Sequence, residues 1–183
     1  TFDRAANLYL GEAAVAQLAP LGWGAGLSRL KMLIAGRADE RYLEREWHDR
    51  FQEHVKVAFA DESACSPEAL AATFLAAVML RIRRQLQREF GSDNLDLIFN
   101  TCIPVDQWER TPVVMSFERV IATAAELARN ASGRENPAKW VESAMTRLPE
   151  IVYDADDDSQ RVFLMPEAVA TAAGYITSIR RRS

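Results

Sequence analysis

Residues 161–175 change from a strand pattern to a helix pattern at Pro166, which constrains the fold of the carboxyl-terminal third. The run Val162–Leu164 consists of residues that favour β-strands. Pro166 lacks a backbone N–H and ends a strand ladder, and Glu167 then stands in the first turn of an alanine-rich helix, where the helix dipole favours a carboxylate. Because ligands bind at the carboxyl ends of strands in α/β sheets, Glu167 is a candidate site residue. The alternative is that Pro166 and Glu167 only start this helix.

A long amphipathic helix is expected between Ser66 and Gly91. Ser66 is a preferred N-cap, Pro67 suits the first helical position, and Gly91 suits the C-cap. Apolar residues recur on one face at helical spacing, and we expect this face to pack on a sheet. The residues of this stripe are Leu70, Phe74, Leu75, Val78, Met79, Ile82 and Leu86.

The remaining pattern alternates helices with strands, which indicates an α/β protein with a mixed sheet flanked by helices. A buried strand is expected over 95–103, ending at Pro104. A β-hairpin is expected to join 150–153 to 161–165 through the acidic turn 154–158. Further helices are expected over 41–54, 116–130 and 136–148, one or two helical turns over 12–18, short strands over 7–11 and 55–59, and a loop over 105–112.

The composition is that of an ordinary globular protein, since the 183 residues are 49% hydrophobic and 26% charged. A net charge of −4 argues against a general nucleic-acid or anionic-membrane partner. The longest apolar run, 75–80, is too short to cross a bilayer. Two cysteines without a Cys-x-x-Cys pair imply no disulfide framework, which fits a cytoplasmic location.

No metal site and no phosphate-binding loop is predicted from local motifs. The spacing of the two histidines puts their rings on different faces of a helix, which argues against zinc. The acidic turn 154–158 is followed by Ser159 where a calcium loop needs Gly, and Met165 stands where it needs Glu. The glycines of 22–26 follow no convincing strand and precede no Lys-Ser or Lys-Thr pair.

Four separated pieces occur in a familiar order: Tyr9–Ala13, the helix led by Ser66-Pro67-Glu68, the strand end Ile103-Pro104, and the run Met165–Ala168. Together they resemble the first lobe of the nucleotide-binding domain of seventy-kilodalton heat-shock chaperones, within the actin-like ATPase superfamily. The resemblance implies a ribonuclease-H-like lobe with an inserted outer subdomain. Residues 1–65 are then expected to belong to the outer subdomain and residues 66–183 to the α/β body, as a partial domain cut from a longer protein.

The resemblance also implies an ATPase that holds ATP with magnesium in a cleft between two lobes. Its implied partners are a second nucleotide-binding lobe and a client or co-chaperone protein. The family's connecting-helix acid, which positions the attacking water, matches Glu167 when the alignment is anchored on Tyr175 and Met165 when it is anchored on Pro166. The Met-Pro-Glu run of plasmid-partition actins and the Gln-Ala-Val of actin favour Glu167, and phosphoryl transfer depends mainly on such positioning.

The family's phosphate-binding hairpins are absent from the chain. Neither an Asp-x-Gly-Thr nor an Asp-x-Gly-Gly-Gly-Thr motif occurs, and the adenosine-binding motif of the other lobe is missing as well. No cofactor-binding residue can therefore be assigned. ATP binding needs backbone N–H groups around the phosphates and carboxylates around the metal's water shell. We expect the 183-residue chain alone neither to bind ATP tightly nor to hydrolyse it.

Two alternatives keep the fold but change the function. An actin-like filament-forming ATPase of the plasmid-partition type is favoured by the Met-Pro-Glu run. A degenerate, non-enzymatic scaffold would use the insertion 134–140 and the helix after it as an interaction surface. The loop with Asp106, Gln107 and Trp108 borders the implied cleft only loosely, and Trp108 is expected to cover the helix below it.

Overall fold

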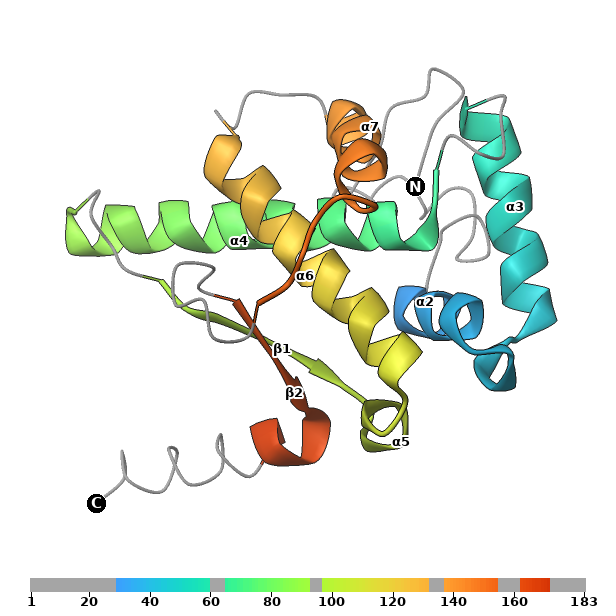
Figure 1. The fold of residues 1–183 in the computed structure, drawn as a ribbon. Helices are drawn as coiled ribbons and strands as arrows, with labels where there is room; N and C mark the ends of the chain where they lie inside the picture. The colour runs from blue at the N-terminus through green and yellow to red at the C-terminus, as the bar shows by residue number, and fades with distance from the viewer. Residues whose placement is uncertain (1–28, 60–64, 93–96, 132–136, 155–161, 172–183) are drawn as a thin grey trace, which may run out of the picture.

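In the described part of the protein, two parallel strands lie against a group of helices (Figure 1). The computed structural model describes residues 29–59, 65–92, 97–131, 137–154 and 162–171. Strand β1 is Phe99–Ile103 and strand β2 is Val162–Pro166, paired in parallel from Phe99 opposite Val162 to Ile103 opposite Pro166. Parallel strands need a crossover connection. Here the crossover contains α5 (Val105–Trp108), α6 (Thr111–Asn130) and α7 (Pro137–Arg147).

The described chain is mostly helical with one small parallel sheet, so it is α/β in the broad sense. Helix α6 lies at its centre and contacts α4 (Pro67–Phe90), α7, β2, α5 and α2 (Leu30–Ala38). Figure 1 shows α6 crossing α4 and running down toward the sheet. Its position between helices and strand explains why buried residues occur around most of its circumference. These are Val113, Phe117, Val120, Ile121, Ala122, Thr123, Ala124, Ala125 and Ala128.

The ends of α4 follow the sequence prediction. The Ser66 hydroxyl accepts a hydrogen bond of 3.1 Å from the backbone N–H of Ala69, and Pro67 lies in the first turn. Gly91 ends the helix in the left-handed conformation, with a φ of 62°, which glycine adopts without steric cost. The N-cap and C-cap predicted for this helix are therefore confirmed.

The buried face of α4 differs from the predicted stripe. Phe74 and Ile82 are 38% and 39% exposed, whereas Leu70 and Met79 are buried. The prediction that α4 packs on a sheet is wrong, because its main contacts are with α6, α7 and α2. Helices can approach closely where side chains are small, so the inward face is built largely from Ala69, Ala72, Thr73 and Ala76.

The first described segment folds as two helices joined by a short turn. Helix α2 is followed by the 3-10 turn η2 (Glu40–Tyr42) and by α3 (Arg45–Phe59). The strand predicted over 55–59 is wrong, because α3 continues through it. Phe51 and Val55 are both 0% exposed, and a spacing of four residues places them on the same helix face.

Two further predictions are corrected between the strands. The loop predicted over 105–112 contains α5 and the start of α6, and α6 begins at Thr111 because Pro112 suits a first turn. The hairpin is wrong, because residues 151–154 form no strand and β2 pairs in parallel with β1. Parallel pairing buries both Val162 and Ile103 in the core. The phenol of Tyr153 contacts the Val162 carbonyl over 3.5 Å instead.

Several predictions fall outside the described residues. These are the strand 7–11, the helical turns 12–18, the glycine loop 22–26 and most of the acidic turn. The helix predicted from residue 136 is confirmed as α7, with Trp140 and Ala144 buried. In the described part of the chain, no helix has both the length and the apolar character that a bilayer span requires.

Gly36→Ala should lower the free energy of unfolding by about 1 kcal/mol. An added Cβ would lie 3.0 Å from the Leu43 Cα and 3.0 Å from the Tyr42 carbonyl oxygen. Overpacking costs about 1–3 kcal/mol, while alanine gains about 1 kcal/mol over glycine in helix propensity. Chemical denaturation measures the difference. Gly91→Ala serves as the comparison, because a Cβ there meets open space and only the positive φ opposes it. A stabilised Gly36→Ala variant would contradict this close contact.

Candidate functional site

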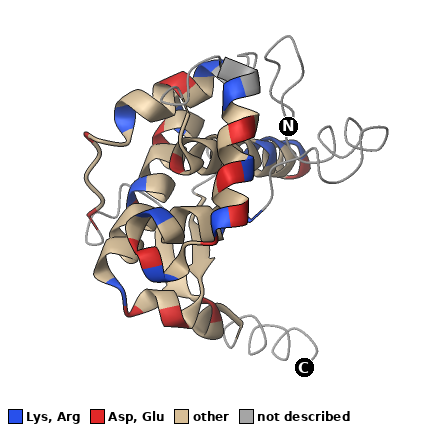
Figure 2. Ribbon diagram, turned by 90° about the vertical axis from the view of Figure 1, so that its right-hand side faces the viewer, with Lys and Arg blue, Asp and Glu red and all other residues tan. Residues whose placement is uncertain are grey.

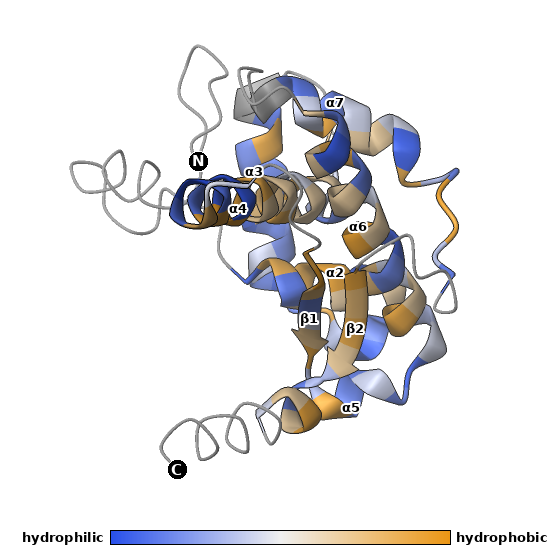
Figure 3. Cartoon of the chain, turned by 90° about the vertical axis from the view of Figure 1, so that its left-hand side faces the viewer, coloured by the Kyte–Doolittle hydropathy of each residue, from blue (hydrophilic) through white to orange (hydrophobic). Residues whose placement is uncertain are grey.

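The strongest candidate site lies where β1 and β2 end. Because the strands are parallel and Ile103 pairs with Pro166, the residues after both strands emerge at the same edge. Figure 3 shows β1 and β2 side by side, with α5 at this end. We call this region the carboxyl edge. It comprises Lys31, Pro104, Gln107, Pro166 and Glu167.

Glu167 lies at the carboxyl edge, paired with a lysine from the amino-terminal part of the described chain. The Lys31 Nζ atom is 2.7 Å from the Glu167 Oε1 atom. The two side chains are 48% and 49% exposed, so solvent or a ligand can reach both. Residues 167–171 are helical, as the junction predicted. The carboxylate therefore does not stand alone at the helix start, because a cation from a distant segment shares the edge with it.

Lys31 is the site residue that the sequence analysis missed. It lies in the first turn of α2, where the helix dipole disfavours a cation. It is also the only charged residue between Leu30 and Gly36. A single lysine within an apolar helical run was the sequence feature that could have drawn attention to Lys31. Only the fold shows that it lies opposite Glu167.

The start of α2 is held by Arg29. This residue has a φ of 56°, a left-handed conformation that a side chain other than glycine rarely adopts. Its guanidinium lies 4.8 Å from the centroid of the Trp47 ring and 3.4 Å from a Glu44 carboxylate oxygen. Cation–π and charge contacts of this kind offset the backbone strain. They fix the direction in which α2, and with it Lys31, begins.

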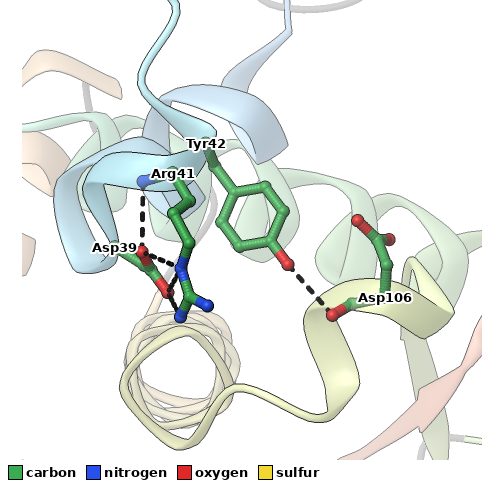
Figure 4. A network of polar contacts seen from close by, with 4 residues as sticks. All are labelled: Asp39, Arg41, Tyr42 and Asp106. Atoms are coloured by element: carbon green, nitrogen blue, oxygen red, sulfur yellow. Dashed lines mark hydrogen bonds and ion pairs between the residues drawn. The ribbon is translucent and has the colours of Figure 1, made fainter.

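A polar network connects η2 with α5 at the same end of the molecule (Figure 4). The Tyr42 hydroxyl donates a hydrogen bond of 3.0 Å to the carbonyl oxygen of Asp106. Asp39 caps η2 by accepting from the Arg41 N–H over 3.1 Å, and it also accepts from the Arg41 guanidinium. This network attaches the segment that carries Lys31 to the segment that follows β1.

The Asp39 carboxyl has a pKa of about 2, lowered from 3.8 mainly by hydrogen bonds from the Arg41 side chain and backbone. The charges of Arg41 and Arg110 act in the same direction. Hydrogen bonds to the ionised form favour it. The ionised Asp39 carboxylate therefore accepts its hydrogen bonds from Arg41 of the same turn, which indicates a structural role.

Gln107 is buried at the carboxyl edge, with 1% of its surface exposed. Its Nε2 atom lies 3.7 Å from the sulfur of Met32, and its Oε1 atom has no hydrogen-bond partner among the described residues. The neighbouring residues differ from Gln107 in burial, because Asp106 is exposed and Trp108 is 38% exposed. Whether Trp108 covers a helix, as the sequence analysis expects, stays a prediction.

Thiol and metal chemistry find little support in the described residues. Burial raises the pKa of Cys65 to about 12, and a protonated, buried thiol is a poor nucleophile. Cys102 lies within β1 and is not disulfide-bonded. No cluster of three His, Cys, Asp or Glu side chains suited to a metal ion occurs in the part of the chain that the structure describes. Figure 2 shows positive and negative residues interspersed along the helices.

The chain matches no protein-family model, and neither curated proteins nor solved structures show similarity to it.

Acidification should remove the stabilising contribution of Asp39. Its pKa is lower in the folded protein than the ordinary 3.8, so ionised Asp39 stabilises the fold above about pH 4, and this contribution is lost as the pH falls toward about 2. Asp39→Asn should flatten the fall in stability over this window. Denaturation curves between pH 5 and 2 for both proteins measure it. Identical pH dependence in the two proteins would contradict the role given to Asp39.

The Lys31–Glu167 pair should contribute less than about 1 kcal/mol to stability, because both side chains are half-exposed and exposed pairs are screened by water. A double-mutant cycle with Lys31→Met and Glu167→Gln measures the coupling energy. The Glu46–Arg50 pair in α3, at 2.8 Å, is a matched control. A coupling above about 2 kcal/mol would mean that the Lys31–Glu167 pair holds the fold together.

Proposed function

We propose that this chain is a lobe of a chaperone-like ATPase, which binds ATP with magnesium in the complete protein and couples its hydrolysis to lobe closure and partner binding. One observation carries the proposal. A lysine and a glutamate from segments 136 residues apart meet at 2.7 Å where two parallel strands end. Ligands of α/β proteins bind at this edge, and phosphoryl transfer depends on charge stabilisation and on positioning of the attacking group.

The two residues divide the chemistry between them. The Lys31 ammonium can bind a phosphate oxygen and stabilise the negative charge of the transferring group. The Glu167 carboxylate can accept a hydrogen bond from the attacking water and orient it, without removing its proton fully. In the structure each neutralises the other. A bound phosphate would compete for Lys31 and release the carboxylate to hold water.

Magnesium fits this arrangement as a phosphate-bound ion. Mg²⁺ keeps several of its water ligands and binds through substrate phosphates and one or two carboxylates. A dedicated cluster of protein ligands is therefore not required, and none occurs among the described residues. Glu167 is the carboxylate of the carboxyl edge that could contact the metal's water shell. When bound, the ion would neutralise charge on the phosphates.

Closure of a second lobe would complete the site. Lys31 and Glu167 are half-exposed, and electrostatic interactions of this kind strengthen when water is excluded. The segment that carries Lys31 is also hydrogen-bonded to α5 through Tyr42. A ligand that moves Lys31 would therefore act on η2 and α5 as well.

Glu167→Gln in the full-length protein should lower kcat for ATP hydrolysis on the order of 100-fold, the range expected when a positioned carboxylate is lost. The KM for ATP should change by only a few-fold, because the amide keeps the side chain's shape. Steady-state phosphate release measures both constants. Lys31→Met should instead raise the KM, since it removes a charge that binds phosphate.

The control is Glu46→Gln, which neutralises another ion-paired glutamate, in α3, away from the strand ends. It should leave both constants unchanged. Equal kcat in Glu167→Gln and wild type would remove Glu167 from the reaction. A full-length wild type without ATP turnover would overturn the proposed function.

A further inference from the structure

Helix α4 exposes a row of large apolar side chains. The row consists of every fourth residue from Phe74 to the last residue of the helix, namely Phe74, Val78, Ile82, Leu86 and Phe90. Phe74, Ile82 and Phe90 are 38%, 39% and 69% exposed, and Val78 and Leu86 are partly exposed. None of the five belongs to the hydrophobic core of the described residues or packs against it. We call this row the outer ridge.

The outer ridge is exposed because α4 packs through a different side. Ala69, Ala72 and Ala76 are 0% exposed, and the contacts of α4 are with α6, α7 and α2. Figure 1 shows the carboxyl-terminal part of α4 extending past α6. Burying alanines while phenylalanine and isoleucine stay in water forgoes the larger hydrophobic gain. An exposed apolar patch with polar residues at its rim marks a surface that contacts another protein.

The geometry of the outer ridge fits a second helix. Side chains four residues apart on an α-helix are neighbours, and a row of them forms a ridge that packs into the groove of another helix. From Phe74 to Phe90 the ridge extends about 24 Å along the helix axis, at about 1.5 Å per residue. A partner helix of about four turns matches this length.

The charges beside the ridge indicate an acidic partner. Arg81, Arg84 and Arg88 follow one another at spacings of three and four residues, so they lie on one side of the helix. Arg81 also follows Val78 by three residues, which places these arginines beside the outer ridge. We call the three arginines the basic row. Carboxylates of a docked helix would be attracted to it.

The other charged residues of this part of α4 do not cancel the basic row. Glu89 is the one acidic residue between 81 and 90, and it accepts a hydrogen bond of 3.0 Å from Gln85 of the same helix. Arg83 is directed to α6, where its guanidinium contacts the Ala128 carbonyl over 3.5 Å. Two copies of α4 facing each other would bring their basic rows together, and this repulsion disfavours a second copy as the partner.

We propose that the outer ridge is a docking site for an acidic amphipathic helix of a partner protein. The apolar face of that helix covers the outer ridge, and its carboxylates lie opposite the basic row. Burial of the ridge supplies most of the affinity, and the arginines determine the charge of the partner. This inference goes beyond the proposed ATPase function and does not depend on it, because the ridge and the basic row contain no residue of the carboxyl edge.

The test measures the binding of two fluorescein-labelled peptides to the full-length protein by fluorescence anisotropy. Both peptides have about 18 residues, enough for the length of the ridge, with leucine along one helix face. The remaining positions are glutamate and alanine in one peptide, and lysine and alanine in the other. The glutamate peptide should bind at least about tenfold more tightly than the lysine peptide, and this preference should shrink as salt is added.

Ile82→Glu should weaken the binding of the glutamate peptide at least about tenfold, because it places a like charge in the middle of the apolar contact. Met115→Glu is the matched control. Met115 is 45% exposed, much like Ile82, but it lies near the start of α6. This variant should change the affinity by less than about twofold.

Two further variants separate the charge from the apolar contact. Replacing the whole basic row, Arg81→Gln with Arg84→Gln and Arg88→Gln, should bring the affinities for the two peptides within about threefold of each other. Phe90→Ser should weaken the glutamate peptide about threefold or more. Because Phe90 is 69% exposed, this variant keeps the test valid if Ile82→Glu does not fold.

Equal affinity for the two peptides, or undiminished affinity in the ridge variants that fold, would overturn the inference. Binding to vesicles that contain phosphatidylserine, with binding to neither peptide, would identify a membrane surface and overturn it. Dimerisation that Ile82→Glu abolishes, again without peptide binding, would identify a second copy and overturn it. The ATPase measurements test the proposed function separately from all of these results.

Discussion

The packing of α6 between α4 and the sheet is the contact on which the rest of the described structure depends. Two strands by themselves are at best marginally stable in water, so the β1–β2 pair needs a helix over it. Helix α6 provides that cover through β2, and its largest contact is with α4. Alanine and threonine occupy much of both buried helix faces. Small side chains let the helices approach closely, which leaves room for α6 to contact helices on one side and the sheet on the other.

The candidate site follows from this arrangement. The sheet register sets Glu167 just beyond Pro166, next to the end of β1. Helix α2 packs on both α4 and α6, which brings Lys31 to the same edge. The hydrogen bond from Tyr42 to Asp106 then fixes the segment after α2 against α5. The short distance between Lys31 and Glu167 is therefore set by the surrounding packing, and the ion pair itself adds little to holding the segments together.

Local signals account for what the sequence predicted well. The caps of α4 at Ser66 and Gly91 and the strand ends at Pro104 and Pro166 depend on neighbouring residues only. The predictions failed where tertiary contacts determine the conformation of a segment or the partner of a strand. Residues 55–59 contain β-branched and aromatic residues typical of strands, but Phe51 and Val55 are buried on one helix face and extend α3. The proximity of residues 150–153 to β2 suggested a hairpin, whereas the partner of β2 comes from more than fifty residues earlier.

The difference between local signals and tertiary contacts also explains which residues of the candidate site could be predicted. The place of Glu167 at a helix start after a strand was predictable, because the strand pattern, the proline and the helix pattern are all local. Lys31 was not, because no local pattern says which distant carboxylate an exposed lysine will meet. The face of α4 was misjudged for a related reason. Large apolar residues and alanines both recur at helical spacing along it, and only the identity of the neighbouring element, a helix instead of a sheet, decides which of the two faces is buried.

The carboxyl edge differs from the rest of the described structure in how its polar groups are used. Asp39 is satisfied by donors of its own turn, and most helix charges face water. At the carboxyl edge, Lys31 lies at the helix end that disfavours a cation, and Gln107 is buried beside a thioether. Arg29, which precedes α2, has a positive φ. Each of these departures reduces stability. Of these residues Lys31 contacts Glu167 directly, and its exposed charge favours an anionic ligand. Under the proposed function, this cation would bind phosphate and the Glu167 carboxylate would orient water.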